Sequence, residues 1–188
     1  MPKTEALLAE FPKTWMLEEG TQVTVRPMAR QDRAKVARFF QSIPEGDLRF
    51  LKEDVQDPRV IERWVKQLDY DRVLPLVAEV EGRIVADASL HRRKEGWRRH
   101  LGGVRVVVDP TFRHRGLASR LVDELIDVAT REGLERLYAE ITAENATALD
   151  VFRKRGFEEV ARFERNIVDP AGEYHDLVVL HLDLAQGG

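Results

Sequence analysis

The residues with the clearest chemical meaning occupy positions 113–118, in the order Arg113, His114, Arg115, Gly116, Leu117 and Ala118. A phosphate group needs several donors in a concave arrangement, and the free N–H groups in the first turn of a helix supply them together with the positive end of the helix dipole. Gly116 lets the backbone approach such a ligand without a Cβ in the way, and the two arginines add positive charge. The run predicts a pyrophosphate site, although taken alone it equally fits an ordinary strand-to-helix turn with a solvated basic edge.

The segments on either side of this run have the patterns of a strand and of a helix. Residues 102–108 are rich in β-branched side chains, which favours a central strand ending at Asp109 and Pro110. Residues 116–132 place leucine, valine and alanine at helical spacing, and Gly133 is a suitable C-terminal stop. We therefore expect Gly116 to stand where the chain passes from strand to helix.

The rest of the chain alternates between helical and extended patterns without internal repeats. We expect residues 1–20 to be an N-terminal tail without regular structure and residues 21–188 to form a single domain. In chain order the patterns predict a strand at 21–26, helices capped by Asp32 and Asp57 with a loop at 45–56 between them, a hairpin of 73–80 and 84–90, a strand at 137–141, a helix at 145–155 and a closing hairpin of 157–168 and 173–184.

Two motifs in this order resemble the signatures of the GNAT superfamily of N-acetyltransferases. The first signature, Q/R-x-x-G-x-G/A at the start of a helix after a hydrophobic-x-Pro turn, is matched by residues 108–110 followed by 113–118. The second, an asparagine followed by a helix and a Gly-Phe pair, is matched by Asn145 with Gly156 and Phe157. The order of elements also agrees from about residue 21 to 184, so the resemblance covers nearly the whole chain.

The resemblance implies an α/β fold with a mixed, splayed central sheet of about seven strands flanked by about four helices. It implies that the sheet opens between residues 104–108 and 137–141, and that the pantetheine arm of acetyl-CoA enters the gap. Backbone groups of the valines then bind the arm and polarise the thioester carbonyl. The residues that the resemblance assigns to the coenzyme are Val106, Val107, Val108, Arg113, His114, Arg115, Gly116, Leu117, Ala118, Ser119, Asn145 and Phe152.

The implied reaction moves an acetyl or related short acyl group from acyl-CoA to a primary amine, by direct attack in a ternary complex. The acceptor stays open between a protein lysine, a protein N-terminus and a small amine. A non-catalytic acetyl-CoA-binding regulatory module is the alternative.

An amine attacks a thioester only as the free base, so a proton acceptor is needed. The resemblance assigns this role to Glu140, five residues before Asn145, and burial between apolar neighbours would raise its pKa toward a useful range. Glu140 is equally well explained as a structural salt-bridge partner, and Glu144 is the second candidate base. Relatives that acetylate protein N-termini use a tyrosine as general acid where this chain has Phe152; Tyr138 and Tyr174 are possible substitutes, although each is also typical of packing.

Composition excludes several other functions. The chain has no cysteine, so disulfides, thiolate metal sites and a cysteine nucleophile are excluded. It has neither an apolar run of roughly 20 residues nor the pattern of an export signal, and we expect a cytoplasmic protein without membrane contact. The spacing of its five histidines predicts no metal site. We expect a monomer or a homodimer.

A basic segment at residues 92–100 contains Trp97 among arginines and a lysine. Such a segment can attract an acidic protein surface, a nucleic acid or the nucleotide end of CoA. A solvated loop between two strands explains it as well. With a formal net charge of −3, we expect no general affinity for nucleic acid.

Overall fold

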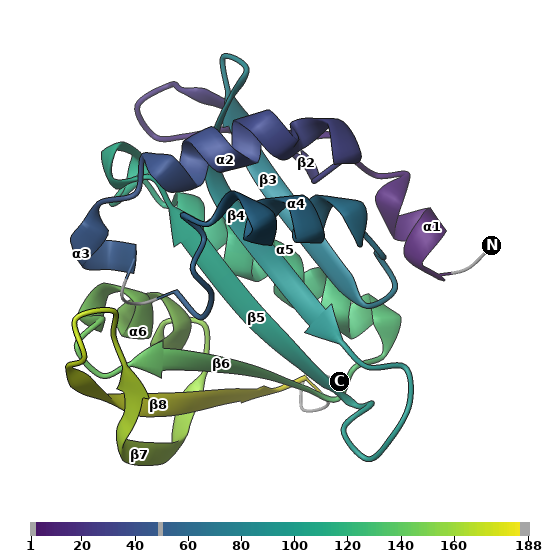
Figure 1. Cartoon of the computed structure of the whole chain (residues 1–188). Helices are drawn as coiled ribbons and strands as arrows, with labels where there is room; N and C mark the ends of the chain where they lie inside the picture. The colour runs from purple at the N-terminus through teal and green to yellow at the C-terminus, as the bar shows by residue number, and fades with distance from the viewer. Residues whose placement is uncertain (1–2, 49–50, 185–188) are drawn as a thin grey trace.

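An eight-stranded mixed sheet forms the centre of the protein, in a computed structural model that describes residues 3–48 and 51–184. The spatial order of the strands is β1-β2-β3-β4-β5-β6-β8-β7 (Figure 1). The strands are β1 (Lys13–Met16), β2 (Gln22–Pro27), β3 (Val73–Val80), β4 (Arg83–Arg92), β5 (Leu101–Val108), β6 (Arg136–Thr142), β7 (Glu158–Val168) and β8 (Tyr174–Asp183). The helices are α1 (Lys3–Leu8), α2 (Arg33–Gln41), α3 (Glu45–Leu48), α4 (Pro58–Lys66), α5 (Leu117–Glu132) and α6 (Ala146–Arg153).

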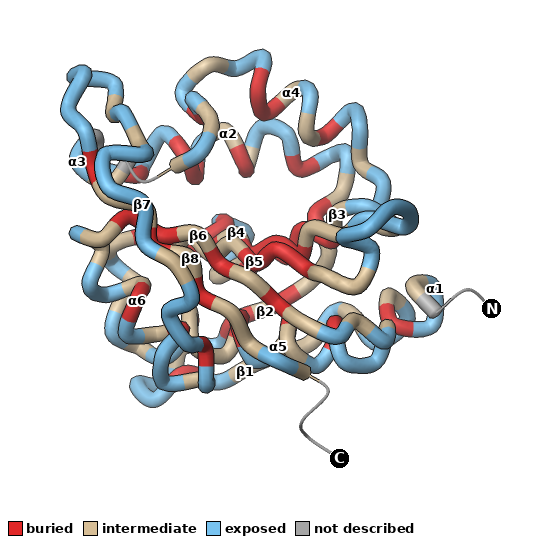
Figure 2. Tube along the Cα trace, turned by 90° about the horizontal axis from the view of Figure 1, so that it is seen from below, coloured by how far each residue is buried: buried red, intermediate tan, exposed pale blue. Residues whose placement is uncertain are grey.

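Helices cover both faces of the sheet, with α2 and α4 on one face and α5 and α6 on the other (Figure 1 and Figure 2). On the side of α5, Leu121 and Leu125 belong to a core that includes Ala88 of β4. On the side of α2 and α4, Phe40 and Ile61 belong to a second, smaller core. The predicted α/β fold is confirmed; β1 and the short helices α1 and α3 are additional to the expected elements.

The sheet opens between β5 and β6, as predicted. These parallel strands pair only where Leu101, Gly102 and Gly103 lie beside residues 136–138. Beyond Gly103, β5 continues to pair with β4, whereas β6 pairs with β8. The backbone groups of residues 104–108 that point away from β4 therefore have no strand beside them.

Two glycines permit the close pairing at the closed end of the gap. A Cβ on Gly102 would lie 2.7 Å from Leu137 Cδ2, and one on Gly103 would lie 2.8 Å from the ring of Tyr138. A side chain at either position would displace these neighbouring side chains, because real Cβ contacts are longer than these distances. Glycine at both positions therefore lets Leu137 and Tyr138 pack directly against β5.

The segment that we expected to be an N-terminal tail is part of the fold where the structure describes it. Strand β1 pairs antiparallel with β2, and both Leu7 and Leu17 are buried in the core beside α5. Glu10 forms an ion pair with Arg131 of α5. Strand β1 has only four residues, so no periodicity marks it in the sequence, and its pairing depends on a partner strand.

Two local expectations need correction. Asp32 precedes α2, but its carboxylate accepts hydrogen bonds from Arg26 at 2.6 and 2.8 Å and from the N–H of Ala29 at 2.7 Å, so it does not cap the helix. The expected loop at 45–56 contains the single-turn helix α3, which is too short to show a repeat. Positions 1–2, 49–50 and 185–188 of the predicted tail, loop and domain lie outside the described residues.

The helix boundaries next to the motifs agree with the sequence. Asp57 caps α4 by accepting the N–H of Arg59 at 2.9 Å. Gly116 and Gly133 bound α5 with φ angles of +76° and +84°. Within the described residues, no helix has the length and apolar character needed to cross a membrane.

Replacing Gly102 by alanine should destabilise the protein by about 1–3 kcal/mol, because the new methyl group overlaps three packed leucine side chains. Chemical denaturation measures the free energy of unfolding. The control is Gly46→Ala on α3, where a Cβ meets no atom within 4 Å; it should leave stability unchanged or raise it by up to about 1 kcal/mol, because alanine favours a helix more than glycine does. Equal losses in the two variants would contradict the packing argument.

Candidate active site

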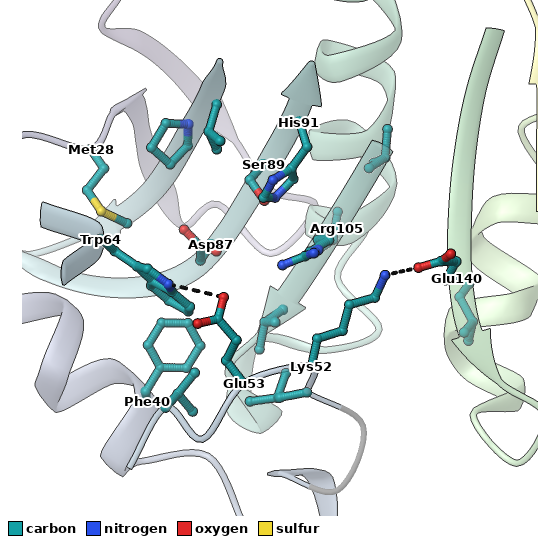
Figure 3. A pocket seen from close by; sticks show the side chains of 18 of the residues that line it. Met28, Phe40, Lys52, Glu53, Trp64, Asp87, Ser89, His91, Arg105 and Glu140 are labelled. Carbon is teal, nitrogen blue, oxygen red and sulfur yellow. Dashed lines mark hydrogen bonds and ion pairs between the residues drawn. The ribbon is translucent and has the colours of Figure 1, made fainter. Parts of the chain in front are cut away.

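A cavity of about 450 Å³ lies between α4, the sheet and the open gap beside β5 (Figure 3). Apolar side chains form one wall, among them Met28, Phe40 and Trp64. The opposite wall is formed by β6 and α6, including Glu140 and Phe152. The cavity therefore joins the second, smaller core to the exposed edge of β5.

Strand β4 contributes a row of polar side chains to the floor of this cavity. Alternation along the strand places Ala86, Ala88 and Leu90 in the core beside α5. Asp87, Ser89 and His91 point to the other face and line the cavity, as Figure 3 shows. Ser89 Oγ lies 2.9 Å from His91 Nε2.

Asp87 is the most perturbed carboxyl group of the site. Its Oδ1 atom is buried and has no hydrogen-bond partner among the described residues. Burial raises the pKa of Asp87 from its ordinary 3.8 to about 7, and the charge of Arg105 opposes this shift. Burial, with the charges of Arg105 and Lys52, lowers the pKa of His91 to about 4. Near neutral pH, Asp87 therefore titrates while His91 is uncharged.

Asp87 was not predicted from the sequence as a site residue. The only signal available was a carboxylate inside an otherwise apolar run, Ile84-Val-Ala-Asp-Ala-Ser-Leu90. Arg105 was not predicted as a site residue either, because it stands within the β-branched run that predicted strand β5. It also lines the cavity and is the cross-strand neighbour of Ser89.

Glu140 lines the same cavity from β6, but it is not buried as the sequence argument required. Its side chain is 32% exposed and forms an ion pair with Lys52 across the gap. Glu144, the second candidate, is 46% exposed and lies 3.4 Å from Nδ1 of His175. It is not among the residues that line the cavity.

The aromatic residue in the general-acid position brings no hydroxyl group to the cavity. Phe152 is buried and packs edge-to-face on Phe157, with ring centroids 5.0 Å apart. Tyr138 lies under the guanidinium of Arg98, and Tyr174 is exposed. Thr142 lines the cavity, and its buried Oγ1 has no partner among the described residues.

The predicted phosphate motif has the expected backbone geometry. Gly116 adopts a left-handed conformation at the N-terminus of α5, and a Cβ there would meet no protein atom within 4 Å. The first-turn N–H groups of Leu117, Ala118 and Ser119 have no acceptor within the helix. The space in front of this helix end is therefore open to a ligand.

The side chains of the motif are held by acidic residues of the N-terminal half. Arg113 donates to Asp47 at 2.7 Å and to the carbonyl of Val108 at 3.2 Å. Arg115 donates to Glu19 at 2.6 Å. His114 has a φ of +59°. These contacts tie the turn to β5 and to the loop before β2.

Asn145 caps α6 by accepting the N–H of Ala148 at 3.1 Å, and it also lines the cavity. Val106 and Val107 line the cavity as well, while Val108 is buried. Arg155 donates to the carbonyl of Ser119 at 2.9 Å and so joins α5 to the end of α6. The structure thus brings both sequence motifs to the two sides of the gap.

Two features lie outside this constellation. Oxygen and nitrogen atoms of Asp169, Glu173 and His175 lie within 4.8 Å of one another at the tip of the β7–β8 hairpin. Asp169 there accepts the N–H groups of Ala171 and Glu173, which explains the cluster as part of the turn. The absence of a metal site stays a prediction. The basic segment 92–100 forms the loop between β4 and β5, with Trp97 87% exposed.

Comparison with known proteins identifies the family of this chain. Residues 38–157 match the model of the Acetyltransferase (GNAT) family. The chain belongs to this GNAT family. The predicted resemblance is thereby confirmed, and the family is one of acetyl-CoA-dependent acetyltransferases.

Individual relatives are similar in sequence to part of this chain. The ribosomal protein bS18-alanine N-acetyltransferase of Salmonella typhimurium is 34% identical over 80 residues, which are 43% of this chain and 53% of that protein. The L-amino acid N-acetyltransferase AaaT of Escherichia coli is 29% identical over 97 residues, 50% of this chain and 60% of that protein. The chain thus spans about half the length of the first of these relatives.

Similarity to a solved structure extends further. The ribosomal-protein-alanine N-acetyltransferase from Brucella melitensis superposes with a TM-score of 0.74 at 27% identity. The superposition covers 85% of this chain and 98% of that one. The fold is therefore shared over most of this chain.

Replacing Asp87 by asparagine should stabilise the protein at alkaline pH more than at acid pH. The folded-state pKa of Asp87 is raised from 3.8 to about 7, so the folded protein binds more protons than the unfolded chain between these values. The free energy of unfolding of the wild type therefore falls as pH rises through this window. At roughly 1.4 kcal/mol per pKa unit, the variant should gain on the order of a few kcal/mol over the wild type between about pH 5 and about pH 8.

Urea denaturation at the two pH values measures this difference. The control is Asp150→Asn on α6, where the carboxylate is 60% exposed; its effect should be small and nearly the same at both pH values. A pH-independent effect of Asp87→Asn would show that the Asp87 carboxyl is not perturbed.

Proposed function

We propose that this protein transfers an acetyl or similar short acyl group from acyl-CoA to a primary amine, by direct attack of the amine on the thioester. The observation that carries the proposal is the half-buried carboxyl group of Asp87, whose inaccessible Oδ1 has no hydrogen-bond partner among residues 3–48 and 51–184, in a cavity that reaches the open edge of β5. Membership of the GNAT family supports the donor. The names of the two relatives support an amine acceptor on a protein or an amino acid.

We propose that the coenzyme lies along the gap between β5 and β6. Its pyrophosphate binds the N–H groups at the start of α5, beside Gly116, with Arg113, His114 and Arg115 adding charge and polar contacts. Its pantetheine arm pairs with the free backbone of residues 106–108 in the manner of a strand. Asn145 and Phe152 form the wall on the side of α6.

In this proposal, Asp87 accepts the proton that the amine must lose. Its pKa of about 7 suits a general base, because about half of the carboxyl groups are ionised near neutral pH. Glu140 is the second candidate, since it lines the same cavity, but its carboxylate is paired with Lys52. A CoA thiolate is a good leaving group and departs without a strong acid; Thr142 supplies a nearby hydroxyl in place of the one that Phe152 lacks.

Replacing Gly116 by leucine should weaken acetyl-CoA binding at least about tenfold, because the new side chain occupies the open space in front of α5. Isothermal titration measures the dissociation constant. Gly172→Leu is the matched control, because Gly172 also has a positive φ, +85°, and an open Cβ position, but lies in the β7–β8 turn. Unchanged affinity in Gly116→Leu would refute the pyrophosphate assignment.

Asp87→Asn should lower kcat/KM by roughly 10²–10⁴-fold and remove the rise in activity through pH 7 that we expect of the wild type. Release of free CoA with a panel of primary amines measures both effects. Glu140→Gln is the control and should keep the same pH profile; the opposite result would make Glu140 the base. Tight acetyl-CoA binding by the wild type without CoA release across the panel would instead identify a non-catalytic binding module.

A further inference from the structure

We infer that the acceptor is a free α-amino acid with an apolar side chain, bound through its carboxylate by Arg105 and through its ammonium group by Asp87. The inference rests on the proposed acetyl transfer and names the acceptor class for it. The inference follows from which charged side chains of the cavity form ion pairs with each other and which do not.

Most charged groups that line the cavity already have partners. Lys52 pairs with Glu140, and Arg63 pairs with Glu53. Glu53 also accepts the indole N–H of Trp64 at 3.4 Å. These pairs connect segment 51–55 to α4 and to β6. Asp69, an exposed carboxylate that also lines the cavity, accepts the N–H of Asp71 at 3.1 Å.

Arg105 and Asp87 differ from these groups. Within residues 3–48 and 51–184, no hydrogen bond or ion pair is found for the Arg105 guanidinium or for the Asp87 carboxyl group. Both residues are half-buried, and a charge partly removed from water gains from a partner, so a cavity in which a cation and a carboxyl group stand side by side favours a ligand with both complementary charges. A zwitterion meets this requirement and a simple amine does not.

The spacing of the two groups suits a zwitterion whose charges are close together. Arg105 stands opposite Ser89 in the β4–β5 pairing, and Asp87 is two residues from Ser89 on the same face. The two side chains are therefore diagonal neighbours on adjacent strands, within reach of a small molecule. Figure 3 shows both pointing into the cavity. An α-amino acid carries its ammonium and carboxylate groups on one carbon atom and can contact both side chains at once.

The opposite wall accommodates the rest of the acceptor. Phe40 and Trp64 pack edge-to-face with centroids 5.6 Å apart, and Met28, Leu51 and Val55 extend this apolar surface. An apolar side chain on the acceptor is removed from water there. A protein N-terminus fits less well, because its carboxyl group is bound in an amide and offers no charge to Arg105.

In the proposed transfer, the amine nitrogen loses two protons and gains the acetyl group. The Asp87 carboxylate takes one proton from the ammonium group, and the free amine attacks the thioester carbonyl carbon. A C–N bond forms, the C–S bond breaks, and the departing thiolate of CoA takes up the second proton that the nitrogen loses. The products are the N-acetyl amino acid and CoA, and Asp87 returns its proton to solvent.

Leucine, leucinamide, 3-methylbutylamine and a leucine-initiated dipeptide test the inference, because they share the side chain and the amine but only leucine has an adjacent carboxylate. The wild type should show kcat/KM for leucine at least about 100-fold above that for the other three. Arg105→Gln should lower the leucine value by about 100-fold, mainly through KM, and leave the other three within a few fold. Arg105→Lys should restore part of the leucine activity, since it keeps the charge.

The control is Arg38→Gln, at an exposed position on α2, which should leave all four acceptors unchanged. Melting temperatures of the variants verify that each is folded. Equal use of leucine and leucinamide by the wild type, or an equal loss on all acceptors in Arg105→Gln, would overturn the inference.

Calorimetric binding of leucine to the protein without acetyl-CoA separates the inference from the proposed function. Leucine binding that is lost in Arg105→Gln supports the amino acid site even if no acceptor releases CoA. Absence of leucine binding, together with CoA release from other amines, overturns the acceptor assignment while acetyl transfer stands. If leucine does not bind and no amine releases CoA, both the acceptor assignment and the proposed acetyl transfer are overturned.

Discussion

The separation of β5 from β6 after Gly103 is the constraint on which the rest of the site depends. Backbone N–H and C=O groups need partners wherever they are removed from water, and an interior strand edge without a neighbour leaves them available. Gly102 and Gly103 hold the strands together at one end, because Leu137 and Tyr138 occupy the space of their absent side chains. From Val104 onward the strands separate, and the cavity is open to the free edge of β5.

Strand β4 meets two demands with one alternating pattern. Its alanines and leucine fill the core beneath α5, while Asp87, Ser89 and His91 face the cavity. Asp87 Oδ1 is removed from water without a hydrogen-bond partner in the described residues, which costs free energy that the cores on both faces of the sheet must offset. The same burial gives Asp87 a pKa of about 7, so the destabilising feature is also the one that suits it to accept a proton.

Charge pairing divides the acidic and basic side chains of the site into two groups. The first group joins distant segments: Arg113 to Asp47, Arg115 to Glu19 and Lys52 to Glu140. These pairs hold the N-terminal half of the chain against the turn at 113–118 and across the gap. Arg105 and Asp87 form the second group, since neither is in an ion pair within the described part of the chain, and we propose that they bind the acceptor.

The sequence by itself determined the features that depend on contiguous residues. The turn at 113–118, the glycines that bound α5 and the Asn145 cap of α6 follow from local backbone chemistry, so their spacing was enough to predict both the elements and the family. The family resemblance that the two motifs carry also implied where the sheet opens.

Tertiary structure decided which side chains face the cavity and how deeply each is buried. Glu140 and Asp87 both stand in strands between apolar neighbours, yet Glu140 meets Lys52 from a distant segment and Asp87 meets no partner in the described chain. Strand β1 likewise exists because β2 offers it an edge. Burial and pairing of this kind arise from segments far apart in the chain, so the sequence pattern around a single residue does not contain them.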